Sequence, residues 1–200
     1  MTLDQYRSVA NRLLGPWVAA ADRLGLTPNQ VSVVAFAAAV AAGGAFYVGT
    51  AAAYAAGAAL VFLNGWLDLV DGALAREQAV ASEGGDLLDH VLDRYADIAI
   101  IAGFAAGIGR YDLGLLAVTG VLMTSYLGTQ IQAVGLGREY GGLLGRADRL
   151  ALMGFVGFAA AVVPGDLVAG VGVVGLLLVL FAVVGHLTAL QRFLGAWRDL

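Results

Sequence analysis

The strongest constraint on the fold of this chain is a succession of long apolar segments. Hydrophobic residues make up 60% of its 200 residues and charged residues only 13%, and the mean hydropathy is +0.83. These values lie far outside the usual range for soluble domains. A predominantly apolar helix of about 20 residues crosses the hydrocarbon core of a bilayer. The sequence therefore predicts an all-α, polytopic membrane protein.

Six segments have the length and composition of transmembrane helices. The first has a clear start, because Thr27 can cap a helix, Pro28 suits the first turn and Gln30 completes a capping box. We expect a single domain over 1–200, with a six-helix bundle at 27–196 and a polar tail at 191–200. The six predicted spans are 27–48, 51–75, 85–108, 113–134, 146–163 and 167–190.

The N-terminal segment has a different character from the six spans. Over 3–24, apolar residues recur at helical spacing and charged residues lie between them. This pattern is typical of an amphipathic helix at a membrane surface. We expect such an interfacial helix within residues 1–26.

The basic residues predict the orientation of the bundle. All eleven are arginines, and with six spans ten fall on one side and only Arg110 on the other. Because cytoplasmic loops carry the excess of positive charge, we expect both termini to face the cytoplasm in a cell membrane. The sequence pI of about 4.9 argues against a nucleic-acid partner.

A cluster of carboxylates interrupts the second and third apolar segments. Asp68 and Asp71 are three residues apart, and Asp89 and Asp93 are four apart, so each pair shares one face of a helix. A carboxylate at the centre of a membrane helix costs roughly 2.5–3.5 kcal/mol, and four of them repel one another. Hard oxygen ligands suit Mg²⁺ or Mn²⁺. The sequence predicts two such ions, held by these four aspartates on the cytoplasmic side.

The residues between the two acid pairs suit a diphosphate. Arg76 offers a planar fork for phosphate, and Gly72 and Ala75 leave room for a flat group near the backbone. Gly85 begins the third span at a place where close helix approach is plausible. Two metal ions would neutralise phosphate oxygens, and Asp93 could take a proton from an attacking hydroxyl.

Together these residues resemble the signature of the CDP-alcohol phosphotransferase family. The pattern matches at eight fixed positions, and the sequences TPNQVS before it and DRYAD at its end are also similar to the family. The resemblance implies a homodimer that binds a CDP-linked lipid together with Mg²⁺ or Mn²⁺. An acceptor hydroxyl then attacks the phosphorus nearer the lipid, and CMP leaves. The signature reads Asp68-x2-Asp71-Gly72-x2-Ala75-Arg76-x8-Gly85-x3-Asp89-x3-Asp93.

The resemblance also implies a role for each matching residue. Asp68, Asp71 and Asp89 would be metal ligands, and Asp93 would be both a ligand and the general base. Asp86 and Asp97 continue the same helix face but lie outside the signature. The residues expected to bind the CDP-lipid are Gly72, Ala75, Arg76, Ser82, Gly85, Asn29 and Ser32.

The later sequence resembles the branch of the family that makes inositol phosphate and glycerophosphate lipids, through SYLGTQIQAVG and GLLGRADRL. That branch usually has two cations where this chain has Gly128 and Gln130. Arg146, Arg149 and Arg192 remain as candidates to bind a small polar acceptor alcohol, with or without a phosphate. The arginine-only, acidic composition favours a salt-adapted archaeal source, and therefore an archaetidyl lipid.

Two other classes of protein use carboxylates in a membrane. An intramembrane prenyltransferase also grips a diphosphate through Mg²⁺, but it needs a different acid spacing and has no reason for Gly72, Ala75 and Arg76. A divalent-cation transporter, the non-enzymatic alternative, would place acids near the midplane of several helices. The sequence instead clusters them on two helices toward one side.

Overall fold

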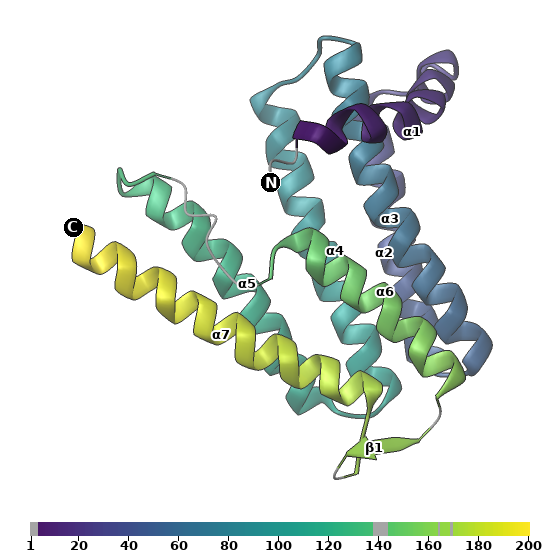
Figure 1. The fold of residues 1–200 in the computed structure, drawn as a ribbon, viewed down its shortest axis with the longest axis vertical. Helices are drawn as coiled ribbons and strands as arrows, with labels where there is room; N and C mark the ends of the chain where they lie inside the picture. Colours follow the sequence, from purple (N-terminus) through teal and green to yellow (C-terminus); the bar gives the residue numbers. More distant parts are fainter. Residues whose placement is uncertain (1–3, 138–143, 164, 169) are drawn as a thin grey trace.

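The computed structural model describes residues 4–137, 144–163, 165–168 and 170–200. This part of the chain forms seven helices and one short β-hairpin (Figure 1). The elements are α1 (Asp4–Arg23), α2 (Pro28–Val48), α3 (Ala51–Glu77), α4 (Glu83–Gly107), α5 (Tyr111–Ala133), α6 (Arg146–Val162), β1 (Asp166–Val168), β2 (Val171–Gly172) and α7 (Val173–Asp199).

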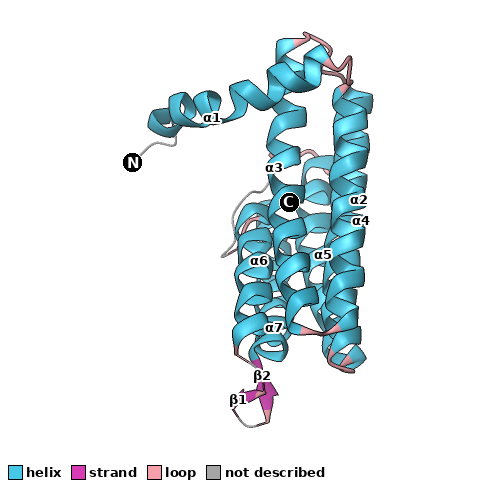
Figure 2. Cartoon of the chain, turned by 90° about the vertical axis from the view of Figure 1, so that its right-hand side faces the viewer, coloured by secondary structure: helices cyan, strands magenta, loops and turns pink. Residues whose placement is uncertain are grey.

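Helices α2, α3 and α4 run close to the long axis of the molecule, and α5, α6 and α7 are inclined to them (Figure 1). Helix α1 lies across one end of the bundle (Figure 2). The α3–α4 loop lies at the same end as α1, and the β-hairpin lies at the opposite end (Figure 1). Arg110 lies beside the hairpin, where it shares a cavity with Asp166 and Gly172. It is therefore at the end of the bundle away from α1, as the arginine distribution predicted.

Local capping explains where the first two long helices begin. The Thr27 hydroxyl accepts a hydrogen bond from the Gln30 amide at 3.3 Å, and the Gln30 side chain accepts one from the Thr27 amide at 2.9 Å. This confirms the predicted capping box. At the turn into α3, Gly49 has a φ of +71°, a conformation that glycine adopts without a steric penalty. Thr50 then caps α3.

Glycines allow α2 and α4 to pack almost backbone to backbone. A Cβ atom added at Gly43 would collide with the Ala99 carbonyl, and one added at Gly103 would collide with the backbone of Gly43. Next to this contact, the ring of Phe46 stacks on that of Phe104 with 3.8 Å between centroids. Small residues let membrane helices approach closely, and this approach brings the N-terminal part of α2 beside the acids of α4.

Gly103→Ala is expected to destabilise the bundle, because the added methyl group meets main-chain atoms that cannot rotate away. Overpacking of this kind costs typically about 1–3 kcal/mol. Thermal unfolding in detergent should show a clearly lower midpoint than for the unmodified protein. Gly44→Ala is the matched control, since a Cβ there has no neighbour within 4 Å. Equal midpoints for the two variants would contradict the tight α2–α4 packing.

Helix α1 docks on the end of α3. Its apolar side chains Leu14, Val18 and Ala21 are buried with Val70 and Leu74. From Leu13 onward, where the structure describes the side chains of α1, its remaining residues are exposed. This one-sided burial is the amphipathic pattern read from the sequence, and the crosswise direction of the helix (Figure 2) suits a place at a membrane surface.

The last predicted span, 167–190, and the polar tail at 191–200 are wrong in their boundaries. Residues Asp166–Val168 and Val171–Gly172 pair as two antiparallel strands, helped by Gly165 and Gly170, whose φ angles are +93° and +75°. Hydropathy could not separate this apolar hairpin from the helix that follows. Helix α7 runs on to Asp199, because a helix can continue past an apolar run wherever no proline or capping glycine stops it.

Four of the helices in the described ranges have the length and hydropathy of membrane spans, namely α2, α3, α5 and α7. Helix α6 has only 17 residues, and α4 carries Asp93, Arg94 and Asp97 in its middle. The chain is thus a multi-pass membrane protein. The count of six spans stays a prediction. It is consistent with α4 and α6, which run alongside the four long apolar helices.

Candidate active site

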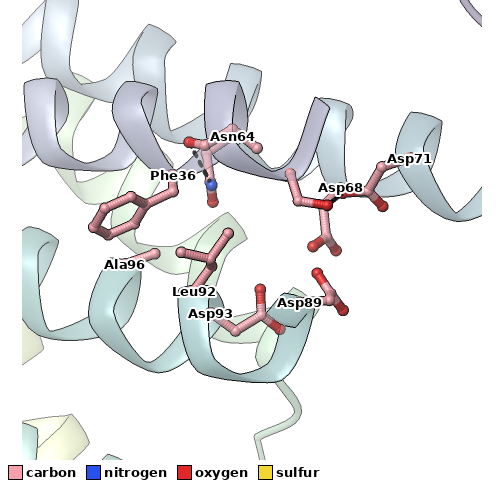
Figure 3. A pocket seen from close by; sticks show the side chains of 10 residues that line it. Phe36, Asn64, Asp68, Asp71, Asp89, Leu92, Asp93 and Ala96 are labelled. Carbon is pink, nitrogen blue, oxygen red and sulfur yellow. Dashed lines mark hydrogen bonds between the residues drawn. The ribbon is translucent and has the colours of Figure 1, made fainter. Parts of the chain in front are cut away.

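The four aspartates of the signature meet in one cavity. Asp68 and Asp71 lie in the last turns of α3, and Asp89 and Asp93 lie in the first half of α4. Figure 3 shows the carboxylates of Asp68, Asp89 and Asp93 facing one another across the space between the two helices. Asp68, Asp71, Asp89 and Asp93 all line this space, which we call the acid cavity.

Three of the carboxylates form the tightest group. Asp68, Asp71 and Asp89 each offer an oxygen, and these atoms all lie within 4.8 Å of one another. Asp71 is 6% exposed. Bringing three carboxylates so close without a cation is unfavourable, and an all-oxygen donor set suits Mg²⁺ or Mn²⁺. The residues therefore fit the metal site predicted from the sequence.

Asp93 lines the same cavity but has arginine partners. Its Oδ1 lies 2.6 Å from Nη2 of Arg146, and its Oδ2 lies 3.7 Å from Nη2 of Arg94. Arg146 also reaches Asp68 Oδ2 at 2.9 Å. Arg146, which begins α6, thus ties α6 to the acids of both α3 and α4. The structure places Asp93 where the three-acid group meets a set of arginines.

The residues predicted to bind the CDP-lipid gather at the same end of the bundle. Ser82 caps α4 by accepting a hydrogen bond from the Gly85 amide at 3.1 Å. A Cβ added at Gly85 would lie 3.5 Å from Oδ1 of Asn29, so the starts of α2 and α4 are neighbours. Gly72, Ala75 and Arg76 follow Asp71 in the last two turns of α3.

Ser32 has a more specific place than the sequence indicated. It is buried, and its hydroxyl donates to Asp71 Oδ2 at 2.7 Å and lies 3.1 Å from the Pro28 carbonyl. A hydroxyl that donates to a carboxylate fixes its orientation. We therefore assign Ser32 to holding Asp71 in place.

A larger open cavity of about 850 Å³ adjoins the acids. We call it the arginine cavity. The three arginines predicted for the acceptor, Arg146, Arg149 and Arg192, all line it although they come from α6 and α7. Arg192 donates to the Thr124 carbonyl at 2.5 Å. Gly128, at one of the two positions where the family branch has a cation, also lines this space.

Sequence reasoning missed the role of Arg94. It lines the arginine cavity, donates to the Ser125 hydroxyl and lies within ion-pair distance of Asp93 and Asp97. The signal was present in DRYAD, where Arg94 directly follows the last acid of the signature. It was overlooked because residues adjacent in sequence point about 100° apart on a helix, and only the position of α5 shows that Arg94 faces a cavity.

Comparison with known proteins points to the same family as the signature in the sequence. The family model described as CDP-alcohol phosphatidyltransferase matches residues 25–197. Archaetidylinositol phosphate synthase of Methanothermobacter thermautotrophicus is 32% identical over 200 residues, which cover 99% of this chain and 95% of that protein.

Solved structures are similar over nearly the whole chain. Phosphatidylinositol phosphate synthase of Mycobacterium tuberculosis with CDP-DAG bound matches with a TM-score of 0.78 at 27% identity, covering 93% of this chain and 94% of that one. The same protein in complex with manganese and citrate matches with a TM-score of 0.79 at 26% identity, covering 92% of this chain and 88% of that one. The proteins named here are synthases of inositol phosphate lipids, and none of them is a prenyltransferase or a cation transporter.

Proposed function

Since the chain belongs to the CDP-alcohol phosphatidyltransferase family, we propose that it transfers a lipid-phosphate group from a CDP-lipid to an inositol phosphate. CMP is released, and the chain is a membrane transferase of phospholipid biosynthesis. The observation that carries the transfer reaction is the position of Asp93, which lines both the acid cavity and the arginine cavity. A hydroxyl held in the second cavity can therefore meet a diphosphate held at the first.

Asp68, Asp71 and Asp89 would hold the metal together with Asp93, and two ions per site remain our expectation from the signature. Bound Mg²⁺ or Mn²⁺ supplies positive charge to a diphosphate and to a departing phosphate. The related Mycobacterium tuberculosis protein was crystallised with manganese. Ser32 holds the Asp71 carboxylate through its hydrogen bond at 2.7 Å, so this ligand is oriented before any ion binds.

The remaining signature residues would receive the CDP-lipid at the start of α2 and the ends of α3 and α4. Arg76 supplies a planar donor for phosphate, and Gly72, Ala75 and Gly85 leave the backbone accessible. Asn29 and Ser82 offer polar groups beside Gly85. Asp93 would take the proton from the acceptor hydroxyl, because it is the carboxylate that both cavities share.

The charge of the arginine cavity favours a phosphorylated acceptor. Among the described residues that line it, four are arginines, namely Arg94, Arg146, Arg149 and Arg192, and one, Asp93, is acidic. A phosphate monoester carries about −1.5 to −2 charges at neutral pH, and arginine forks bind its oxygens in pairs. The similar proteins named above make inositol phosphate lipids, which supports inositol phosphate over the glycerol phosphate that the sequence left open.

Three further features belong to this proposal. The lipid would be archaetidyl, as in the Methanothermobacter relative. The active site and both termini would face the cytoplasm, in line with the arginine distribution. The homodimer stays a prediction of the family resemblance.

The acceptor is tested by offering alternatives in parallel to the purified protein with Mn²⁺ and one CDP-lipid. We expect CMP release with inositol phosphate, and much slower release with glycerol phosphate, serine or unphosphorylated inositol, because these lack either the phosphate or the ring. The measurement is CMP formation, repeated with CDP-archaeol and CDP-diacylglycerol as lipid donors.

Two controls make the result interpretable. CMP should appear only when lipid and alcohol are both present, so each is omitted in turn. Preferred use of glycerol phosphate or of an uncharged alcohol would contradict the inositol phosphate assignment. Metal flux into sealed vesicles without any CMP release would contradict the transferase itself.

A further inference from the structure

Asp97 is a buried charge that the chemistry described above does not use. It is 1% exposed and lies one helical turn beyond Asp93 on α4. In the part of the chain that the structure describes, it belongs neither to the three-acid group nor to the lining of the acid and arginine cavities. It is therefore placed behind the two cavities and not in their lining.

The contacts of Asp97 are with two arginines of the arginine cavity. Its Oδ2 lies 3.1 Å from Nη2 of Arg149, which comes from α6, and 4.0 Å from Nη1 of Arg94, which comes from α4. Arg149 is itself 6% exposed. Arg149 makes a second, longer hydrogen bond from Nη1 to the Leu144 carbonyl at 3.5 Å. Asp97 is thus the main acceptor that fixes the Arg149 guanidinium.

This arrangement leaves donors of both arginines without a partner. Nε of Arg149 and Nε of Arg94 are buried and have no hydrogen-bond partner among the described residues. A buried ion pair adds little net stability, because desolvation of the two charges offsets their attraction. The stability of the fold therefore does not explain why a carboxylate occupies this position. A role in orienting the Arg149 and Arg94 side chains, which line the arginine cavity, does explain it.

We propose that Asp97 is a positioning residue for the acceptor, which holds the guanidinium groups of Arg149 and Arg94 at the wall of the arginine cavity. This inference rests on the proposed function, because it takes the cavity to be the acceptor site. Nη2 of Arg149 donates a hydrogen bond to Asp97, and the Arg149 side chain also lines the arginine cavity. The anionic group of the acceptor then meets a preset donor and does not have to draw a mobile arginine into place.

A purely electrostatic role makes the opposite prediction. If Asp97 acted only through its charge, its removal would make the cavity more positive and would lower the KM for a phosphorylated acceptor. If it acts by orientation, removal frees Arg149 and raises that KM. Asp97→Glu also distinguishes the electrostatic role from the orienting role, because it keeps the charge and displaces the carboxylate by one methylene group.

The experiment measures initial rates of CMP release for Asp97→Asn, Asp97→Glu, Arg149→Gln and the double variant Asp97→Asn/Arg149→Gln. Residues that orient a ligating side chain typically change affinity by roughly 10-fold to 100-fold. We expect the KM for inositol phosphate to rise at least about tenfold in Asp97→Asn and to rise in Asp97→Glu. The KM for the CDP-lipid and the Mn²⁺ concentration for half-maximal rate should stay within about twofold.

The double variant supplies the decisive readout. Asp97 acts mainly through Arg149, which it contacts at 3.1 Å, whereas Arg94 is 4.0 Å away. The double variant should therefore have nearly the KM of Arg149→Gln alone, because residues that act as a unit are not additive. Multiplying effects would overturn the proposal, as would a KM that is unchanged or lower in Asp97→Asn. Equal changes in the KM for inositol phosphate, the KM for the CDP-lipid and the Mn²⁺ requirement would show that Asp97 only supports the fold, and would also overturn the proposal.

Two precautions keep the test decisive. Removing one partner of a buried ion pair destabilises a protein strongly, so unfolding in detergent is recorded for each variant. If Asp97→Asn does not fold, Asp97→Glu and the double variant, which lacks both charges, carry the comparison.

Turnover of inositol phosphate by the unmodified protein is measured first. Its absence would contradict the proposed function alone, and the KM series would then use the acceptor that is turned over.

Discussion

Asp93→Asn is expected to reduce transfer by a factor of roughly 10² to 10⁴, the contribution of a positioned general base. The amide has the shape of the carboxylate but cannot accept the proton of the acceptor hydroxyl. Binding of the CDP-lipid should be largely retained, because Asp68, Asp71 and Asp89 form their close group without Asp93. The measurement is CMP release at saturating substrates, together with the affinity of the variant for the CDP-lipid.

The matched control for this variant is Asp86→Asn. Asp86 lies on the same helix two turns earlier, and its side chain is 72% exposed. This variant should keep nearly full activity. Unchanged turnover in Asp93→Asn would remove the base assignment. Loss of both CDP-lipid binding and turnover would instead show that the main role of Asp93 is to bind metal.

Removal of divalent metal is expected to abolish CMP release, and Mg²⁺ or Mn²⁺ should restore it. Three carboxylates within 4.8 Å of one another repel unless a cation lies among them, and without that cation the diphosphate would add further negative charge. In Asp71→Asn the Mn²⁺ concentration for half-maximal rate should rise at least about tenfold, since even residues that only orient a ligand change metal affinity by about that factor.

Asp112→Asn is the control for the metal experiment. Asp112 pairs with Arg110 at 2.8 Å at the opposite end of the bundle, so its loss should leave the metal requirement unchanged. Full activity after exhaustive chelation, confirmed by metal analysis, would contradict a metal-dependent site. An unchanged Mn²⁺ requirement in Asp71→Asn would contradict the place of Asp71 among the ligands.

The helices of this protein, the first helix cap and the acid cluster could be read from the sequence because each depends on residues close together in the chain. The Thr27–Gln30 capping box is found as predicted. The spacing of the aspartates within each pair placed them on one face of a helix. Local reasoning failed at 166–172, where the apolar run is a hairpin, because hydropathy records only how apolar a segment is and not its backbone conformation.

The sequence by itself determined that the chain is a helical membrane protein of a recognisable family, and it identified the acids and the three arginines of the site. Only the tertiary structure decided which of these residues touch. Arg146 bridges Asp68 and Asp93, and Arg149 reaches the buried Asp97 on another helix. Pairs separated by about 50 residues or more have no fixed period, and their contact depends on how closely whole helices pack. In this protein glycines that lack a Cβ atom set part of that packing, where Gly103 lies against Gly43.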